Sequence, residues 1–269
     1  MSDKEYRVPR RILVCQTQEE LFEAAAQIVV QAVSIKREIG HSYSVALSGG
    51  STPQRLFARL AADPYRGKVD WSSIHVFWGD EREVPPDHAD SNFRMAKEHL
   101  LDRVPIPPDQ VLRMEGERPA QEAAVRYEDV LQRAFSLKNK EVVPCFDLIL
   151  LGMGPDGHTA SLFPKTSVLE ETKRWVAAPW VEKLHTHRIT LTPPVLNAAH
   201  RILFVVSGLD KAQAAQAVLE GPSQPRQYPA QLVNPVQGDL IWLMDREAAS
   251  QLQQTSVTEW ERDKGMVIG

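Results

Sequence analysis

Short apolar runs that alternate with longer amphipathic segments constrain the fold of this chain more than any other feature. Four of these runs are apolar at most positions, and they lie at residues 43–47, 74–78, 146–151 and 202–206. Strands that are apolar on both faces are typical of a parallel sheet covered by helices on both sides. The alternation therefore predicts an α/β fold, with a mostly parallel central sheet flanked by helices on both faces.

The other predicted elements follow from the same patterns. Further strands are predicted at residues 11–16, 175–180, 187–191 and 240–243, and helices at residues 17–40, 53–62, 90–101 and 119–137 and from about residues 193, 210 and 245. The proline-rich stretches at residues 104–108 and 222–229 are too short for linkers between domains. We therefore expect a single domain over residues 1–269.

Three helix starts are marked by residues whose side chains can accept hydrogen bonds from free backbone N–H groups. Thr17 is followed three residues later by Glu20, the spacing of a capping box. Thr52, which directly precedes a proline, and Asp90 are the expected N-caps of the next two helices. These assignments fix where we expect the first three helices to begin.

Composition excludes several classes of protein. The chain has 269 residues, a formal net charge of −4 and 43% hydrophobic residues, which are ordinary values for a globular protein. The mild acidity, without a basic block, argues against binding to nucleic acid. Residues 1–11 are too polar for a signal peptide, and no apolar run approaches the roughly 18–20 residues of a membrane helix. We therefore expect no nucleic-acid or membrane partner, and a monomer rather than an oligomer.

The two cysteines indicate whether the protein works in a reducing or an oxidising compartment. Cys15 and Cys145 lie in or beside apolar runs, so they are expected to be small buried residues. Two such cysteines make neither a disulfide framework nor a metal cluster. Together with the missing targeting segment, they predict a cytoplasmic protein.

Polar, glycine-rich segments recur where predicted strands end. They are residues 48–53 (SGGSTP), residues 79–82 (GDER), residues 152–158 (GMGPDGH) and residues 207–211 (SGLDK), joined by Arg188 in the strand HRITL. In open α/β sheets, ligands bind beyond the carboxyl ends of the strands. The recurrence therefore predicts one ligand site that the four segments share with Arg188.

The SGGSTP segment is a candidate phosphate cradle. Its two glycines allow a tight turn and a close approach of the backbone to a ligand. A helix that begins at Thr52 and the proline after it would point free N–H groups at an anion, beside the serine hydroxyls. The spacing is not that of a P-loop, and a purely structural turn is the alternative. The candidate residues are Ser48, Gly49, Gly50, Ser51 and Thr52.

The glycine-rich segment after residue 151 matches the pattern GxGxxG, yet it does not predict a dinucleotide site. Asp156 would face the pyrophosphate with like charge, Pro155 removes a donor, and no acidic residue follows at the spacing of a ribose partner. What remains is Asp156 two residues before His158, and a histidine can act as a base near neutral pH. A histidine that only caps a helix is the alternative.

Two cations near strand ends add to the case for a phosphorylated ligand. A guanidinium binds phosphate through two parallel hydrogen bonds, and an ammonium binds it as a point charge. Arg188 and Lys211 supply one of each. Each alone is typical of a charged surface, but their occurrence with the SGGSTP segment favours a shared phosphate.

The GDER segment leaves two interpretations open. It places Asp80, Glu81 and Arg82 together where a strand ends. These side chains either hold sugar hydroxyls or form an internal ion-pair network.

Other sites are excluded or weak. The chain contains no HExxH motif and no GxSxG nucleophile elbow. His185 and His187 alternate along a predicted strand, which is a weak metal signal and typical of a solvated face. We therefore expect no metal.

Five segments together resemble the 6-phosphogluconolactonase family, which belongs with the glucosamine-6-phosphate isomerases in one larger group. The matching segments are residues 45–57 (VALSGGSTPQRLF), 77–96 (FWGDEREVPPDHADSNFRMA), 147–164 (DLILLGMGPDGHTASLFP), 187–199 (HRITLTPPVLNAA) and 205–212 (VVSGLDKA). They occur in the order found in the family, and the flanking segments fit its length. The resemblance implies a Rossmann-like fold of the sugar-phosphate isomerase and lactonase type.

The resemblance also implies an activity: hydrolysis of 6-phosphoglucono-1,5-lactone to 6-phosphogluconate, the second step of the oxidative pentose phosphate pathway, without metal or organic cofactor. It places the substrate phosphate on the SGGST loop with Arg188 and Lys211. It makes His158 the general base, while Asp156 either orients the imidazole or binds a sugar hydroxyl. The oxyanion donors are either backbone N–H groups of residues 152–158 or Arg82.

Two alternatives remain beside the lactonase. By resemblance, the sister isomerases carry a glutamate five residues after the motif histidine, and this position holds Phe163 here. Asp80 aligns with the proton-transferring aspartate of the isomerases, so a role for it stays open. The second alternative is a sugar-phosphate-binding regulator without turnover. Such a protein has no need of a base at His158, and the presence of His158 and Asp156 therefore favours an enzyme.

Overall fold

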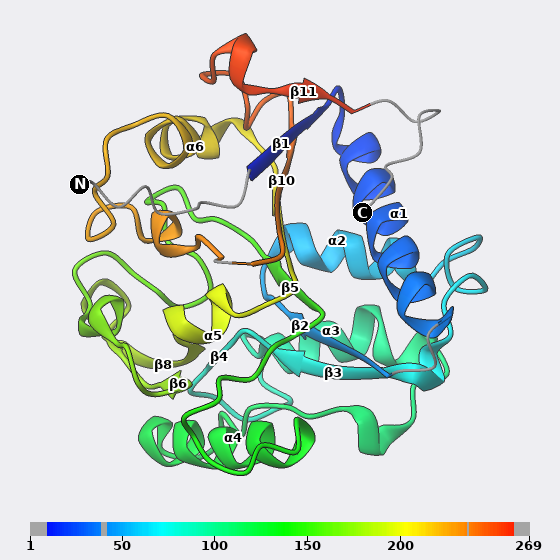
Figure 1. Ribbon diagram of the computed structural model, residues 1–269, viewed down its shortest axis with the longest axis vertical. Coiled ribbons are helices and arrows are strands. Elements are labelled where there is room, and N and C mark those ends of the chain that lie inside the picture. The colour runs from blue at the N-terminus through cyan, green and yellow to red at the C-terminus, as the bar shows by residue number, and fades with distance from the viewer. Residues whose placement is uncertain (1–9, 39–41, 236, 261–269) are drawn as a thin grey trace.

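The central sheet of the computed structural model, which describes residues 10–38, 42–235 and 237–260, is parallel throughout. Figure 1 shows it nearly edge-on at the middle of the molecule. This confirms the predicted mostly parallel sheet. Its strands, in spatial order, are β11 (Thr258–Glu259), β1 (Arg10–Cys15), β10 (Asp239–Asp245), β9 (Arg201–Val206), β5 (Leu148–Leu151), β2 (Tyr43–Leu47) and β3 (Ile74–Trp78).

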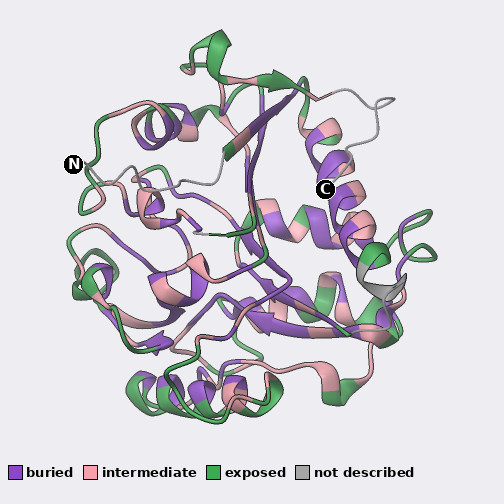
Figure 2. Cartoon of the chain, in the orientation of Figure 1, coloured by how far each residue is buried: buried purple, intermediate pink, exposed green. Residues whose placement is uncertain are grey.

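Helices cover this sheet on both faces, as expected. Figure 1 shows α1 and α2 on one side and α5 and α6 on the other. The inner strands are almost wholly buried (Figure 2), because each of their faces lies under a helical layer. The helices are α1 (Gln18–Glu38), α2 (Ser51–Leu60), α3 (Asn92–His99), α4 (Ala120–Ala134), α5 (Pro193–Asn197) and α6 (Ala212–Leu219).

A second, smaller sheet was not predicted. It consists of β4 (Asp80–Arg82), β8 (Thr186–Leu191), β6 (Val176–Ala177) and β7 (Trp180–Val181), and every pairing in it is antiparallel. Strands of two or three residues are too short to show a periodicity of two. The predicted strand at residues 175–180 is broken in two by Ala178 and Pro179, and a proline cannot donate to a sheet.

This second sheet corrects the placement of Arg188. The prediction put it beside a strand end of the parallel sheet, but β8 is antiparallel to β4 and Arg188 lies opposite Arg82. Residues from both sheets nevertheless meet at one place, because β4 follows directly on the carboxyl end of β3.

Half of the predicted capping box is confirmed. The side-chain oxygen of Thr17 accepts the backbone N–H of Glu20 at 3.2 Å. The Glu20 carboxylate accepts the N–H of Gln16 at 2.9 Å, one residue before the cap, rather than the N–H of Thr17. The predicted end of this helix near Gly40 lies outside the described residues, as do most of residues 1–11.

Two other predicted caps are wrong. Helix α2 begins one residue before Thr52, with Gly50 as its N-cap. Helix α3 is capped by Ser91 rather than Asp90, since the Ser91 hydroxyl accepts the N–H of Arg94 at 3.2 Å. Capping residues stood next to one another in both segments, and the backbone turn decided which of them became the cap.

The helix predicted from about residue 245 is also wrong. Residues 246–251 form turns instead. The Asp245 carboxylate accepts the N–H of Ala248 at 2.8 Å, as an N-cap would, but it also accepts N–H of Gly208. No helix in the described part of the chain is long and apolar enough to cross a membrane. The single domain over residues 1–269 stays a prediction.

Candidate active site

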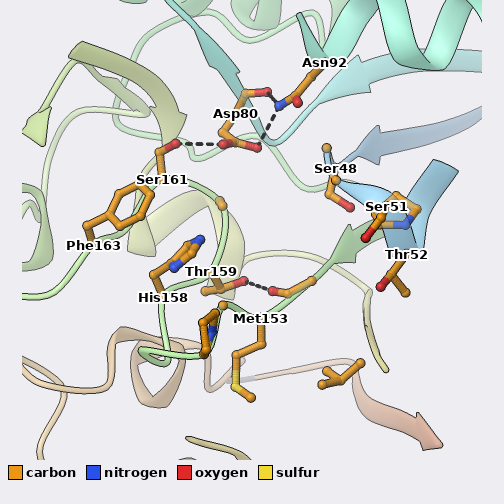
Figure 3. A pocket seen from close by; sticks show the side chains of 18 of the residues that line it. Ser48, Ser51, Thr52, Asp80, Asn92, Met153, His158, Thr159, Ser161 and Phe163 are labelled. Atoms are coloured by element: carbon orange, nitrogen blue, oxygen red, sulfur yellow. Dashed lines mark hydrogen bonds between the residues drawn. The ribbon is translucent and has the colours of Figure 1, made fainter. Parts of the chain in front are cut away.

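A pocket of about 420 Å³ opens where β2, β5 and β9 end and where β4 and β8 pass beside them. Figure 3 shows side chains of β4 and of the segments that follow β2 and β5 pointing into it, among them Asp80, Ser48 and His158. Every predicted substrate-binding residue lines it, together with the predicted base. These residues are Ser48, Gly49, Gly50, Ser51, Thr52, Asp80, Arg82, His158, Arg188 and Lys211.

The SGGSTP segment forms a tight turn into α2. Gly50 has φ of +105°, which favours glycine, and a Cβ on Gly49 would lie 1.8 Å from Oδ1 of Asn92. The turn aims the N-terminus of a ten-residue helix at the pocket, and the first N–H groups of a helix have no partner within it. Ser48 is 5% exposed, and its hydroxyl has no hydrogen-bond partner in the described part of the chain. This end of the pocket offers unused donors to an anion.

His158 is held by the turn that follows β5. The N–H of Gly154 donates to the carbonyl oxygen of His158 at 2.9 Å, and the Thr159 hydroxyl donates to the carbonyl oxygen of Gly152 at 2.8 Å. Nδ1 of His158 lies 2.5 Å from Oδ1 of Asp156, and its backbone N–H donates to the same oxygen at 3.2 Å. Because Nδ1 is taken by Asp156, Nε2 is the nitrogen left to accept a proton.

Asp156 is ionised in this arrangement. Burial by itself would raise its pKa, but hydrogen bonds from His158 and Lys183 outweigh burial and hold the pKa well below the usual range of an aspartate. A carboxylate on Nδ1 fixes the tautomer of the imidazole and stabilises the imidazolium that forms when Nε2 takes a proton. Asp156 is also the only predicted site residue that does not line the pocket itself.

The two acidic residues of GDER have different roles. Both oxygens of the Glu81 carboxylate accept backbone N–H groups at the start of α3, from Asn92 at 2.7 Å and Phe93 at 2.8 Å. Burial raises the pKa of Glu81, and these hydrogen bonds oppose the rise. Glu81 therefore anchors a helix. The predicted alternatives, sugar binding or an ion-pair network, do not describe it.

Asp80 faces the pocket and is nearly buried (Figure 3). Its Oδ2 accepts the hydroxyl of Ser161 at 2.7 Å, and the amide of Asn92 donates to its backbone oxygen at 2.9 Å. Asn92 thus connects Asp80 to the glycine turn at Gly49. The sequence analysis did not single out Asn92. The one available signal was its position within the matching segment at residues 77–96.

Three of the four cations that line the pocket have few partners of their own. Among the described residues, the hydrogen bonds of Arg82 and Arg188 go to the backbone oxygens of Asp90 and His187. Burial and the neighbouring Arg82 lower the pKa of Arg188. Lys211 pairs with Asp210 at 2.7 Å. Two guanidiniums on facing strands repel each other, and an anion between them would relieve that repulsion.

Lys183 and Phe163 complete the surroundings of His158. The ring of Phe163 stacks on the imidazole, with centroids 4.2 Å apart. Lys183 pairs with Asp156 and lies over the face of the same phenyl ring. Sequence analysis missed Lys183, because its segment is exposed and carries no motif of its own.

No metal cluster is found in the described ranges, where no three histidine, cysteine or acidic residues come together. His185 sits at the tip of a hairpin with φ of +48°, and His187 packs edge-on against Trp180. The expectation of a metal-free protein stays a prediction.

A family model described as glucosamine-6-phosphate isomerases/6-phosphogluconolactonase matches residues 16–242. The chain belongs to this family. A 6-phosphogluconolactonase from Nostoc sp. is 43% identical over 212 residues, covering 78% of this chain and 85% of that protein. A probable 6-phosphogluconolactonase 2 from Oryza sativa subsp. japonica is 35% identical over 266 residues, with 94% of each chain covered.

Comparison of the fold with solved structures identifies the same family. The structure of 6-phosphogluconolactonase from Trypanosoma cruzi superimposes with a TM-score of 0.81 at 27% identity, covering 92% of this chain and 99% of that one. The predicted Rossmann-like fold of the isomerase and lactonase type is thereby confirmed.

Proposed function

We propose that this protein hydrolyses 6-phosphoglucono-1,5-lactone to 6-phosphogluconate, the second step of the oxidative pentose phosphate pathway. Relatives that carry the name 6-phosphogluconolactonase support this reaction. One observation about the chain itself carries the proposal: His158 lies in a pocket with its Nδ1 on an ionised Asp156, so that Nε2 is available as a base.

In the proposed reaction, Nε2 of His158 takes a proton from water as the water oxygen attacks the lactone carbonyl carbon. A tetrahedral intermediate forms, and the bond between that carbon and the ring oxygen then breaks. The imidazolium returns its proton to the departing ring oxygen, so the histidine ends the cycle neutral. Asp156 stays ionised throughout and stabilises the imidazolium.

The oxyanion of the intermediate needs a donor, and we favour Arg82 over the backbone of residues 152–158. Within that turn the N–H groups of Gly154, Gly157 and His158 already donate to atoms of the turn, and Pro155 has none. The guanidinium of Arg82 lines the pocket with one Nη donating to the carbonyl oxygen of Asp90. Its remaining N–H groups are therefore available to developing negative charge.

We place the substrate phosphate on the turn at residues 48–52, with Arg188 and Lys211. The unpartnered hydroxyl of Ser48, the N-terminus of α2 and the two cations all favour an anion there. Fixing the phosphate positions the carbonyl carbon against the water and the base, which removes part of the entropic barrier. A cytoplasmic, monomeric, metal-free enzyme remains our expectation.

The isomerase alternative is disfavoured by Phe163. The position where the sister isomerases have a glutamate is apolar here, and its ring is stacked on the imidazole. A phenyl ring neither donates nor accepts a proton. We expect no conversion of glucosamine-6-phosphate by this protein.

The proposal is tested by following freshly prepared 6-phosphoglucono-1,5-lactone against its uncatalysed decay. The wild type should accelerate hydrolysis, and His158→Ala should lower kcat by about 100- to 10,000-fold, the usual contribution of a general base. His200→Ala, at an exposed histidine outside the pocket, is the matched control and should keep full activity. Binding of 6-phosphogluconate without any acceleration would instead identify a sugar-phosphate-binding regulator.

A further inference from the structure

The turn of the hairpin formed by β7 and β8 places Lys183 in contact with Asp156, beside the proposed base. Strands β7 and β8 pair over two residues on each side, and the turn between them contains the short helix Glu182–Leu184 and His185. Lys183 and Leu184 from this turn line the pocket. The hairpin is thus the segment that brings a third charged group to the pair formed by Asp156 and His158.

Lys183 contacts both of the groups that hold the imidazole. Its Nζ pairs with Oδ2 of Asp156, the oxygen that His158 does not use. The same Nζ lies 4.7 Å from the ring centroid of Phe163, the ring that stacks on the imidazole of His158. An ammonium over the face of an aromatic ring is a favourable arrangement.

The exposure of Lys183 argues against a role in stability. Its side chain is 51% exposed, and an ion pair that exposed contributes little to folding. Its contacts are instead concentrated on the two residues, Asp156 and Phe163, that fix the position of the base.

We propose that Lys183 is a positioning residue that, through Asp156 and Phe163, aligns His158 and sets the pH range in which it works as a base. The inference rests on the proposed function, in which His158 is that base. Lys183 holds one carboxylate oxygen so that the other stays on Nδ1. It also partly neutralises the negative charge of Asp156, so that this charge stabilises the imidazolium less.

The direction of the pH effect follows from the charges. Removing Lys183 takes a positive charge away from the imidazole and leaves Asp156 with His158 alone, and both changes favour the protonated imidazolium. The base form would then appear only at higher pH. The other charged groups that line the pocket, namely Asp80, Arg82, Arg188 and Lys211, stay in place and act equally on both proteins.

The test compares Lys183→Met with Lys183→Arg and with Lys173→Met, at an exposed lysine outside the pocket. In Lys183→Met we expect the acid limb of the kcat/KM profile to move up by about 0.5–1 pH unit and kcat to fall by about three- to tenfold, with KM almost unchanged. Lys183→Arg should keep most of the wild-type kcat and of the wild-type acid limb. Lys173→Met should match the wild type in both. A raised KM with an unchanged pH profile would overturn the proposal, because it would place Lys183 on the substrate.

A double-mutant cycle with Asp156→Asn tests whether Lys183 acts on His158 through the Asp156 carboxylate. If Lys183 acts through the Asp156 carboxylate, Lys183→Met should shift the acid limb much less in the Asp156→Asn background. An equal shift in both backgrounds would overturn the proposal.

NMR titration of the His158 ring gives a readout that needs no substrate, with the signal assigned by its loss in His158→Gln. The midpoint should rise in Lys183→Met and stay unchanged in Lys173→Met. An unchanged midpoint in Lys183→Met would overturn the inference even if the enzyme is active. A raised midpoint in a protein without lactonase activity would contradict the proposed function and leave the coupling intact.

Discussion

The two ends of the pocket differ in how their polar groups are satisfied. At one end, His158 has its Nδ1 on Asp156, Asp156 has a second partner in Lys183, and the backbone of the turn is hydrogen-bonded to itself. At the other end, the hydroxyl of Ser48 has no partner in the described part of the chain, although it is buried. A buried polar group without a partner is costly, and because Ser48 lines the pocket, we expect a bound ligand to supply the partner.

The difference teaches how the two ends contribute to the reaction. In the proposed reaction, the end that holds the base is organised before substrate arrives, and an organised base lowers the barrier without rearrangement. We expect the other end to gain its missing hydrogen bonds only on binding. Changes at the first end should therefore lower kcat, and changes at the second should raise KM.

Among the variants that test this comparison, Gly154→Ala should have the largest effect. A Cβ at this position would lie 2.1 Å from Cε1 and Nδ1 of His158 and 2.8 Å from Oδ1 of Asp156, so the imidazole must move. We expect kcat to fall by about 100-fold, as for other small displacements of a catalytic group, with KM changed little. Steady-state kinetics on the lactone checks this. Gly67→Ala, where a Cβ meets nothing within 4 Å, is the control. Full activity in Gly154→Ala would show that the base needs no fixed position.

The next effect tests the two cations that we assign to the substrate phosphate. Arg188→Met and Lys211→Met should each raise KM for the phosphorylated lactone by about ten- to 100-fold, because each removes a charge-assisted hydrogen bond to phosphate. Hydrolysis of the lactone without phosphate should change little. Arg82→Met should instead lower kcat, if it supplies the oxyanion donor. Equal losses on both lactones in Arg188→Met would contradict the phosphate assignment.

Ser48→Ala sharpens the comparison, because binding and stability should move in opposite directions. The KM should rise by about three- to tenfold for the loss of one hydrogen bond, while the free energy of unfolding should stay the same or rise, since an unsatisfied buried hydroxyl is removed. Ser44→Ala is the matched control: the Ser44 hydroxyl donates to Asp147 at 2.8 Å, and its loss should lower the free energy of unfolding. Urea unfolding of both variants measures this. A loss of stability in Ser48→Ala would mean that its hydroxyl is satisfied within the protein.

The parallel sheet could be predicted because burial on both faces leaves a mark in the sequence. Runs such as residues 146–151 and 202–206 are apolar without alternation, and helical segments separate most of these runs. The second sheet left no such mark. Its longest strand, β8, overlaps the strand predicted at residues 187–191, but the other three have only two or three residues. Their pairing joins segments far apart in the chain, as in Arg82 opposite Arg188.

The site shows the same limit at the level of single residues. Glycines and a histidine directly after strands predicted the turn at residues 48–52 and His158, since the strand ends of a parallel sheet meet at one edge. Asn92 and Lys183 reach the pocket from a helix start and a hairpin tip, far along the chain from the groups they contact. The cap predicted at Thr52 is at Gly50, two residues earlier, and the cap predicted at Asp90 is at Ser91, because nearby residues could also serve as caps.

The smallest effect concerns acid stability at the organised end. The pKa of Asp156 is lowered in the folded protein by His158 and Lys183, against the effect of burial. A carboxylate with a lowered folded pKa stabilises the protein above its unfolded pKa of about 3.9, and this contribution disappears as the pH falls through the folded value. Because the pair is partly exposed, we expect the contribution to be only about 1 kcal/mol. Urea unfolding of wild type and Asp156→Asn should therefore differ at pH 6 and converge toward pH 3. A difference that stays constant over this range would show that the Asp156 charge does not stabilise the fold, and that its pairing with His158 and Lys183 serves the base alone.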